Sequence, residues 1–184
     1  MIFLVPYAYD RMPDGKPREG VPVNRLGTKT RCDALIQKLK TIEIEPNESF
    51  EFLLTAGYKK DEKEEPKDKP ELRIANQMAI YIRKINIKLR VFTSHIRAWG
   101  TFEETREAIN EIKEMIGPDY GRVEIYISTN LGHLSRVWLC WFFLKPHGWK
   151  VHFVRANHSF TPKEWVQEAI KFFVYFYHFL LKKW

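Results

Sequence analysis

One short segment near residue 130 combines a backbone site for anions with two side chains that could do chemistry. Residues 129–136 (TNLGHLSR) follow an apolar run and open a helical pattern. Small polar residues at this point leave backbone N–H groups free at the start of a helix, where the helix dipole favours anions. His133 and Arg136 are three residues apart and share one face of the first turn. Arg136 can hold a phosphate or carboxylate, and His133 can move a proton near neutral pH.

The same segment also has a purely structural interpretation. Thr129 or Asn130 could do no more than cap the helix, and Arg136 could pair with a surface carboxylate. The sequence is compatible with both interpretations. In the functional one, His133 is a catalytic candidate, and Thr129, Asn130 and Arg136 are ligand-binding candidates.

A second polar turn, residues 101–104 (TFEE), opens another helical pattern. Thr101 and Glu104 have the spacing of a capping box, which requires no function. Glu103 is not needed by that box. Its carboxylate could bind a hydroxyl or amine of a ligand, act as a base, or only complement the helix dipole. Thr101 is therefore a ligand-binding candidate and Glu103 a catalytic one.

Two further ligand-binding candidates lie in loops that follow predicted strands. Arg25 ends a basic loop that could cradle a phosphate, although for Lys16 and Arg18 of this loop a solvated loop is at least as good an interpretation. Gly57 ends the second predicted strand, where a glycine lets a ligand approach the backbone.

Several familiar motifs are missing from the sequence. It contains no Gly-x-Gly-x-x-Gly fingerprint, no phosphate loop ending in Gly-Lys-Ser/Thr and no Gly-x-Ser-x-Gly elbow. The six histidines lack metal-ligand spacing, and the two cysteines, Cys32 and Cys140, form no Cys-x-x-Cys pair. We therefore expect no metal site, and the sequence identifies no cofactor.

Alternating strands and helices must position the candidate residues. Apolar runs predict strands at 2–7, 50–57, 87–91, 123–128 and 149–154, and helices at 28–42, 72–84, 101–116, 134–144 and from 161 onward. The alternation predicts one Rossmann-like, doubly wound α/β domain over residues 1–184, with a mainly parallel five-stranded sheet and helices on both faces. Such sheets bind ligands at the carboxyl ends of their strands, where the candidate loops would converge.

Two segments stand apart from this pattern. Residues 59–71 are charged and contain no apolar side chain, which predicts a mobile loop within the domain. The predicted last helix, 161–184, begins with the capping-box residues Thr161 and Glu164 and contains the aromatic run FFVYFYHFLL. That run needs cover on more than one side. We favour packing on the sheet plus a homodimer contact, with attachment to a membrane surface as the alternative.

Composition narrows the class of protein and of partner. A chain of 184 residues with 45% apolar residues fits one globular domain. No run approaches the ~18–20 apolar residues of a membrane span, so we expect a cytoplasmic protein. The net charge of +7 suits phosphorylated small molecules, anionic lipid or nucleic acid. Nucleic acid is the least favoured partner, because the basic residues are spread along the chain among many acidic ones.

At these positions the sequence resembles the YdcF/SanA/ElyC-like family over roughly residues 2–158. The most specific marks are Thr101-x-Glu103, similar to the family's Thr-x-Glu-Asn, and Thr129-x-x-x-His133-x-x-Arg136, similar to its Thr-Ser-x-x-His-x-x-Arg-Ala. Weaker marks are Arg25-Leu26, Thr55-Ala56-Gly57 in place of Ser-Gly-Gly, and Ala75 with Met78 from a Glu-Ala-x-x-Met helix. The chain departs from the family pattern at Ile74, Glu104 and Val137.

The resemblance implies a Rossmann-like fold and a ligand of the adenosyl or phosphorylated class. Combined with the residues above, it predicts a protein that binds a phosphorylated or nucleotide-like small molecule, with S-adenosylmethionine and a polyprenyl phosphate as candidates. A hydrolase or transferase activity is compatible with His133 and Glu103. The alternatives are a non-catalytic binding or scaffold protein, and a nucleic-acid-binding module.

Overall fold

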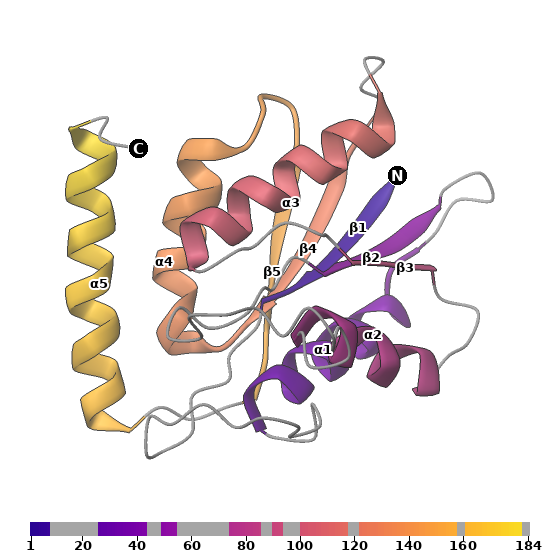
Figure 1. Cartoon of the computed structure of the whole chain (residues 1–184), viewed down its shortest axis with the longest axis horizontal. Helices are drawn as coiled ribbons and strands as arrows, with labels where there is room; N and C mark the ends of the chain where they lie inside the picture. The colour runs from indigo at the N-terminus through magenta and orange to yellow at the C-terminus, as the bar shows by residue number, and fades with distance from the viewer. Residues whose placement is uncertain are drawn as a thin grey trace, which may run out of the picture.

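The sheet has five strands, all parallel, in the order β3-β2-β1-β4-β5 (Figure 1). The computed structural model describes residues 1–7, 26–43, 49–54, 74–85, 90–93, 100–117, 122–157 and 161–181. The strands are β1 (Ile2–Pro6), β2 (Phe50–Leu54), β3 (Arg90–Thr93), β4 (Glu124–Thr129) and β5 (Lys150–Arg155). The helices are α1 (Leu26–Leu39), α2 (Ile74–Ile85), α3 (Thr101–Ile116), α4 (Leu131–Leu144) and α5 (Pro162–Leu180). The predicted doubly wound α/β class is confirmed.

The strand order reverses direction between β1 and β4. From β1 the chain moves outward through β2 to β3, and it then crosses back to β4 and continues to β5. β1 pairs in parallel with β2 on one side and with β4 on the other, so the carboxyl ends of both neighbours open at the same edge. This is the topological switch point, where open α/β sheets bind their ligands.

Helices cover both faces of the sheet because the central strands are apolar on both sides. In β1, Ile2 and Leu4 face the core under α1 and α2, whereas Phe3 and Val5 face the core under α3 and α4. All four side chains are buried. A strand that is buried on both faces reads as a continuous apolar run, as in this segment.

The last helix departs from the prediction. α5 packs against α4 and contributes no residue to either core among the described parts of the chain (Figure 1). The expected packing of this helix on the sheet is therefore wrong. α5 meets α4 through a mixed surface, in which Arg136 pairs with Glu168 and Phe143 stacks on Phe179, and it leaves other apolar side chains outside.

The predicted boundaries differ in accuracy. α3 covers the predicted 101–116, and α5 begins with the predicted capping box of Thr161 and Glu164. α1 begins and ends a few residues earlier than predicted, and β2 is described as far as Leu54, so the rest of the predicted strand 50–57 lies outside the described residues. The predicted mobile segment 59–71 lies outside the described residues. Every helix in the described ranges is too short or not apolar enough to cross a membrane.

Candidate functional site

The site begins where β4 ends and α4 starts. Asn130 occupies the N-cap position of α4 with extended backbone (φ −83°, ψ 161°), but its side chain makes no capping hydrogen bond. Instead, its Oδ1 accepts a hydrogen bond of 3.0 Å from Nη2 of Arg31. Asn130 thus has the position of a cap, as the structural interpretation required, but its side chain connects α4 to α1.

Arg31 is the residue that ties the two halves of the fold together, and the sequence reasoning missed it. Its guanidinium is fully buried, and Nη1 donates to the carbonyl of Tyr7 at 2.7 Å. Its Nη2 also lies 3.3 Å from Nδ1 of His133. A signal was present, because Arg31 stands in register with Leu35 and Leu39 on the apolar stripe of α1. A cation in such a stripe requires polar partners in the interior.

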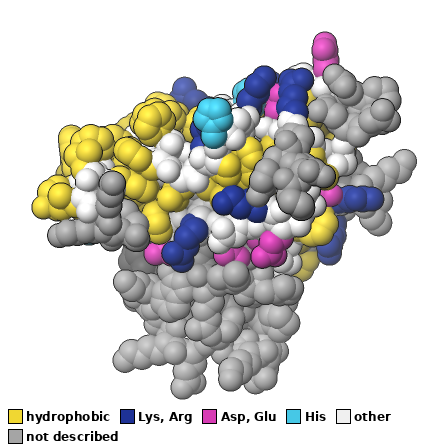
Figure 2. Space-filling model, turned by 90° about the horizontal axis from the view of Figure 1, so that it is seen from above, with side chains coloured by type: hydrophobic (Ala, Val, Ile, Leu, Met, Phe, Trp, Pro, Cys, Tyr) yellow, Lys and Arg dark blue, Asp and Glu magenta, His cyan; other side chains and the backbone are white. Residues whose placement is uncertain are grey.

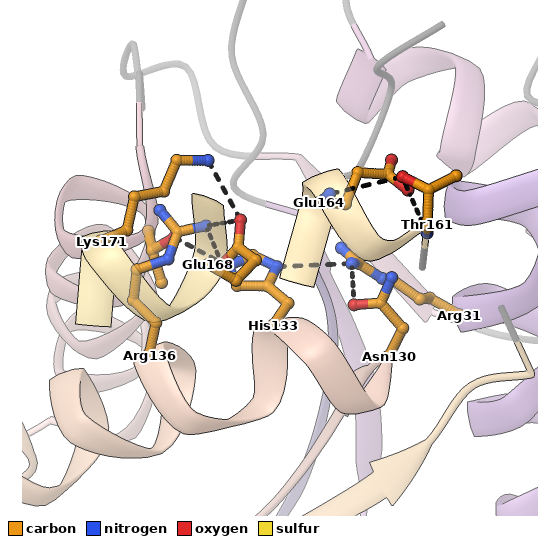
Figure 3. A network of polar contacts seen from close by, with 9 residues as sticks. Arg31, Asn130, His133, Arg136, Thr161, Glu164, Glu168 and Lys171 are labelled. Carbon is orange, nitrogen blue, oxygen red and sulfur yellow. Dashed lines mark hydrogen bonds and ion pairs between the residues drawn. The ribbon is translucent and has the colours of Figure 1, made fainter. Parts of the chain in front are cut away.

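His133 lies between Arg31 on one side and Arg136 with Lys171 on the other (Figure 3). A guanidinium can only donate, so Nδ1 of His133 accepts from Arg31 and Nε2 carries the proton. Nε2 then donates to Oγ1 of Thr101 at 2.9 Å. Burial, followed by the charges of Arg136, Arg31 and Lys171, holds the pKa of His133 well below its usual range. His133 is therefore neutral at pH 7, and proton transfer would first require one of its two hydrogen bonds to break.

Thr101 is recruited by His133 and does not cap α3. The N-cap is Gly100 (φ −161°, ψ 175°), which has no side-chain capping bond, so the predicted capping box of Thr101 and Glu104 is wrong. Thr101 is the first helical residue, and its buried hydroxyl accepts from His133. The helix begins instead with a backbone hydrogen bond from Glu104 to the Gly100 carbonyl.

A second set of buried hydrogen bonds supports the site from below. The Tyr7 hydroxyl bonds with the Thr105 hydroxyl and accepts from Nε1 of Trp141 at 2.9 Å. The Thr105 hydroxyl also lies 2.7 Å from the carbonyl of Thr101 and is positioned to donate to it. Burial raises the pKa of Tyr7, so its phenol stays neutral. Because the Tyr7 carbonyl also accepts from Arg31, β1, α1, α3 and α4 share one continuous polar network.

Arg136 lies on the same side of α4 as His133 and pairs with a carboxylate of α5 (Figure 3). Its Nη2 is 3.0 Å from Oε2 of Glu168, and Nζ of Lys171 is 3.0 Å from Oε1 of the same side chain. The Arg136 guanidinium also lies 5.4 Å from the centre of the Tyr175 ring. The structural interpretation of Arg136 as one half of an ion pair therefore holds, with the difference that Glu168 is buried.

Two buried polar atoms at the start of α4 have no hydrogen-bond partner in the described parts of the chain. They are Oγ1 of Thr129 and Nδ2 of Asn130, on residues that are 1% and 0% exposed. Arg31 fixes the orientation of the Asn130 amide, because only its oxygen can accept. The two N–H groups of Nδ2 therefore have no acceptor among the described residues at the switch point.

The remaining candidates contribute less to this geometry. Glu103 is half-buried in the first turn of α3. Its carboxylate lies close to Gly100: a Cβ atom added at that glycine would be 3.0 Å from Oε2 of Glu103. Burial raises the pKa of Tyr175, and the Glu103 carboxylate adds to that rise. Arg25 and Gly57 lie outside the described residues. The structure thus brings Thr101, Thr129, Asn130 and His133 together, and adds Arg31.

Comparison of the chain with protein-family models, curated proteins and solved structures found no significant match. The resemblance to the YdcF-like family therefore stays a prediction. Among the described residues, no group of three or more His, Cys, Asp or Glu side chains could hold a metal ion. The geometry of the site is therefore the basis for the function proposed below.

Proposed function

We propose that this protein binds an anionic small molecule, phosphorylated or nucleotide-like, at the carboxyl edge of the sheet between β1 and β4. The observation that carries the proposal is the buried Nδ2 of Asn130, which has no partner among the described residues although it stands at the N-terminus of a 14-residue helix. A buried donor without a partner costs about 1–3 kcal/mol. A ligand oxygen at this position would remove that cost.

The surrounding electrostatics support an anion. The first turn of α4 presents backbone N–H groups and the positive end of a helix dipole. Burial is the largest cause of the low pKa of His133, and the charges of Arg136, Arg31 and Lys171 lower this pKa further, as a positive field at the ring would. Glu168 neutralises part of that field, but it lies on the α5 side of Arg136.

The proposal assigns a role to each candidate except Arg136, whose guanidinium pairs with Glu168. Thr129 and Asn130 would contact the anion, Arg31 would hold the Asn130 amide in place, and neutral His133 would donate a hydrogen bond or accept a proton. For a hydrolase or transferase activity, Glu103 would serve as the base or hold a ligand hydroxyl. Arg25 and Gly57 remain candidates for the same edge, and Thr101 positions His133.

The test is a thermal-shift panel of nucleotides, S-adenosylmethionine, sugar nucleotides and polyprenyl phosphates. A ligand present at about 100 times its dissociation constant adds about 2.7 kcal/mol of stability. The informative variant is Asn130→Asp, which keeps the oxygen that accepts from Arg31 but places a negative charge in the proposed anion site. That charge suits a helix N-terminus, so the fold should be as stable as before or more stable.

The matched control is Asn110→Asp, the same substitution at an exposed position of α3. We expect at least one panel member to stabilise the wild type and Asn110→Asp equally, and to lose its effect on Asn130→Asp. Equal stabilisation of Asn130→Asp, or no stabilisation by any panel member, would contradict the proposal.

We also propose that the chain forms a homodimer through its last helix. The supporting observation is that Phe173, Tyr177 and Leu180 of α5 are more than half exposed, at 68%, 58% and 61%. The same exposure would serve a non-catalytic scaffold, which is the alternative function. We also propose that the protein is cytoplasmic.

A further inference from the structure

The last helix packs on α4 through a mixed polar and aromatic side and leaves an apolar side in water. The side towards α4 carries Glu168, which pairs with Arg136 and Lys171. The outward side is an apolar stripe with helical spacing, consisting of Val166, Ile170, Phe173, Tyr177 and Leu180, at 60%, 59%, 68%, 58% and 61% exposure. None of these five residues is charged. An apolar stripe of this kind normally packs against other apolar surface.

The stripe continues onto α4. Trp138 and Phe142 are 45% and 59% exposed and stack on each other, with ring centres 5.1 Å apart. Phe143 joins the two helices, because its ring stacks on Phe179 of α5 at 4.7 Å. We call the combined surface the aromatic face and define it by Trp138, Phe142, Phe143, Val166, Ile170, Phe173, Tyr177 and Leu180. Figure 2 shows hydrophobic side chains gathered on the side of the molecule where α5 lies.

The size of the aromatic face fits a stable protein–protein interface. A large aromatic side chain has a surface of roughly 150–250 Å². With its members about half exposed, the face offers on the order of 800 Å². The largest apolar patch of a typical monomer covers about 300–600 Å², and a standard interface buries about 800 Å² per partner.

We infer that the aromatic face binds the same face of a second copy, so that α4 and α5 of both copies form one interface about a two-fold axis. Each copy carries a net charge of +7, and two such molecules approach best where neither presents a charge. A membrane-bound helix would instead place basic side chains beside its apolar face. Lys171 is turned inward to Glu168, so Lys163 in the first turn is the one exposed Lys or Arg in the described part of α5. The inference rests on the proposed homodimer and adds α4 to it.

Sedimentation velocity of the full chain over a concentration series tests the inference. Phe173→Glu changes the α5 part of the face and Phe142→Glu the α4 part. Ile80→Glu is the matched control, because Ile80 is 48% exposed on α2, on the other side of the sheet. We expect a dimer for the wild type and for Ile80→Glu, and a dissociation constant raised at least tenfold in both other variants. Thermal melts confirm that each variant is folded, and Leu180→Glu replaces Phe173→Glu if that variant unfolds.

The possible results distinguish the inferred interface of α4 and α5 from the proposed homodimer through α5 alone. A wild type that stays monomeric overturns both. A dimer that Phe173→Glu breaks and Phe142→Glu leaves intact overturns the role of α4 and keeps the dimer through α5. Monomers that bind vesicles of phosphatidylserine and phosphatidylcholine, and lose this binding in Phe173→Glu, would assign the face to a membrane and overturn the second copy.

Discussion

Two ion pairs share the carboxylate of Glu168, and we expect them to differ strongly in their effect on stability. Both N–O distances are 3.0 Å, but the Arg136 side chain is 11% exposed and the Lys171 side chain 32%. Breaking a buried pair by removing one partner costs about 3–5 kcal/mol, whereas an exposed pair is worth about 0–1 kcal/mol. We therefore predict a loss of about 3 kcal/mol in the free energy of unfolding for Arg136→Met. For Lys171→Met, we predict a loss below about 1 kcal/mol.

Urea denaturation at one fixed protein concentration measures both values, with the slope m as a check that the compactness of the states is unchanged. The double variant Arg136→Met/Glu168→Met should recover at least half of the loss, since it leaves no uncompensated charge in the interior. Equal and small losses for Arg136→Met and Lys171→Met would refute the reasoning. If the prediction holds, the main role of Arg136 is to attach α5 to α4, so truncating its side chain lowers the free energy of unfolding.

Three further predictions concern the network, the pH response and the last helix. Tyr7→Phe removes the acceptor of Trp141 Nε1 and should cost about 1–3 kcal/mol in urea denaturation, more than Tyr81→Phe at a half-exposed site. Because the folded state holds His133 neutral while the unfolded state takes up a proton below about pH 6.5, the unfolding free energy should fall with acid. The slope is about 1.4 kcal/mol per pH unit until the folded-state pKa is reached, and His133→Gln should lack this contribution. Thr161→Ala should cost about 1 kcal/mol in thermal melts and Thr161→Ser nearly nothing, because only the hydroxyl caps α5; equal losses would contradict the cap.

The parts of the fold that sequence could predict were those with strong local signals. Thr161, Pro162 and Glu164 specify the start of α5 by a hydrogen-bonded box that needs no tertiary contact. Gly117 ends α3 with φ 70°, a conformation that glycine adopts without strain, so that boundary was predictable too. The apolar strands and the alternation with helices determine the parallel sheet in the same way.

The errors arose where a tertiary partner overrides a local pattern. Thr101 has the spacing of a cap, but His133, 32 residues further along the chain, takes its hydroxyl. Arg31 shows its role only when the carbonyl of Tyr7 and the amide of Asn130 are in place around it. α5 is held on α4 by the pairing of Glu168 with Arg136 and by the stacking of Phe179 on Phe143, and the sequence of the helix identifies neither partner.

Mapping where an anion binds tests the central claim most directly. In a titration of the ¹⁵N-labelled protein with inorganic pyrophosphate, the amide resonances of Leu131, Gly132 and His133 should shift first and saturate, since these residues form the first turn of α4. The same titration of Asn130→Asp should leave them in place. Shifts confined to the cations around Glu124, such as Arg122 at the amino edge of the sheet, would contradict the account, as would an absence of saturable shifts in α4.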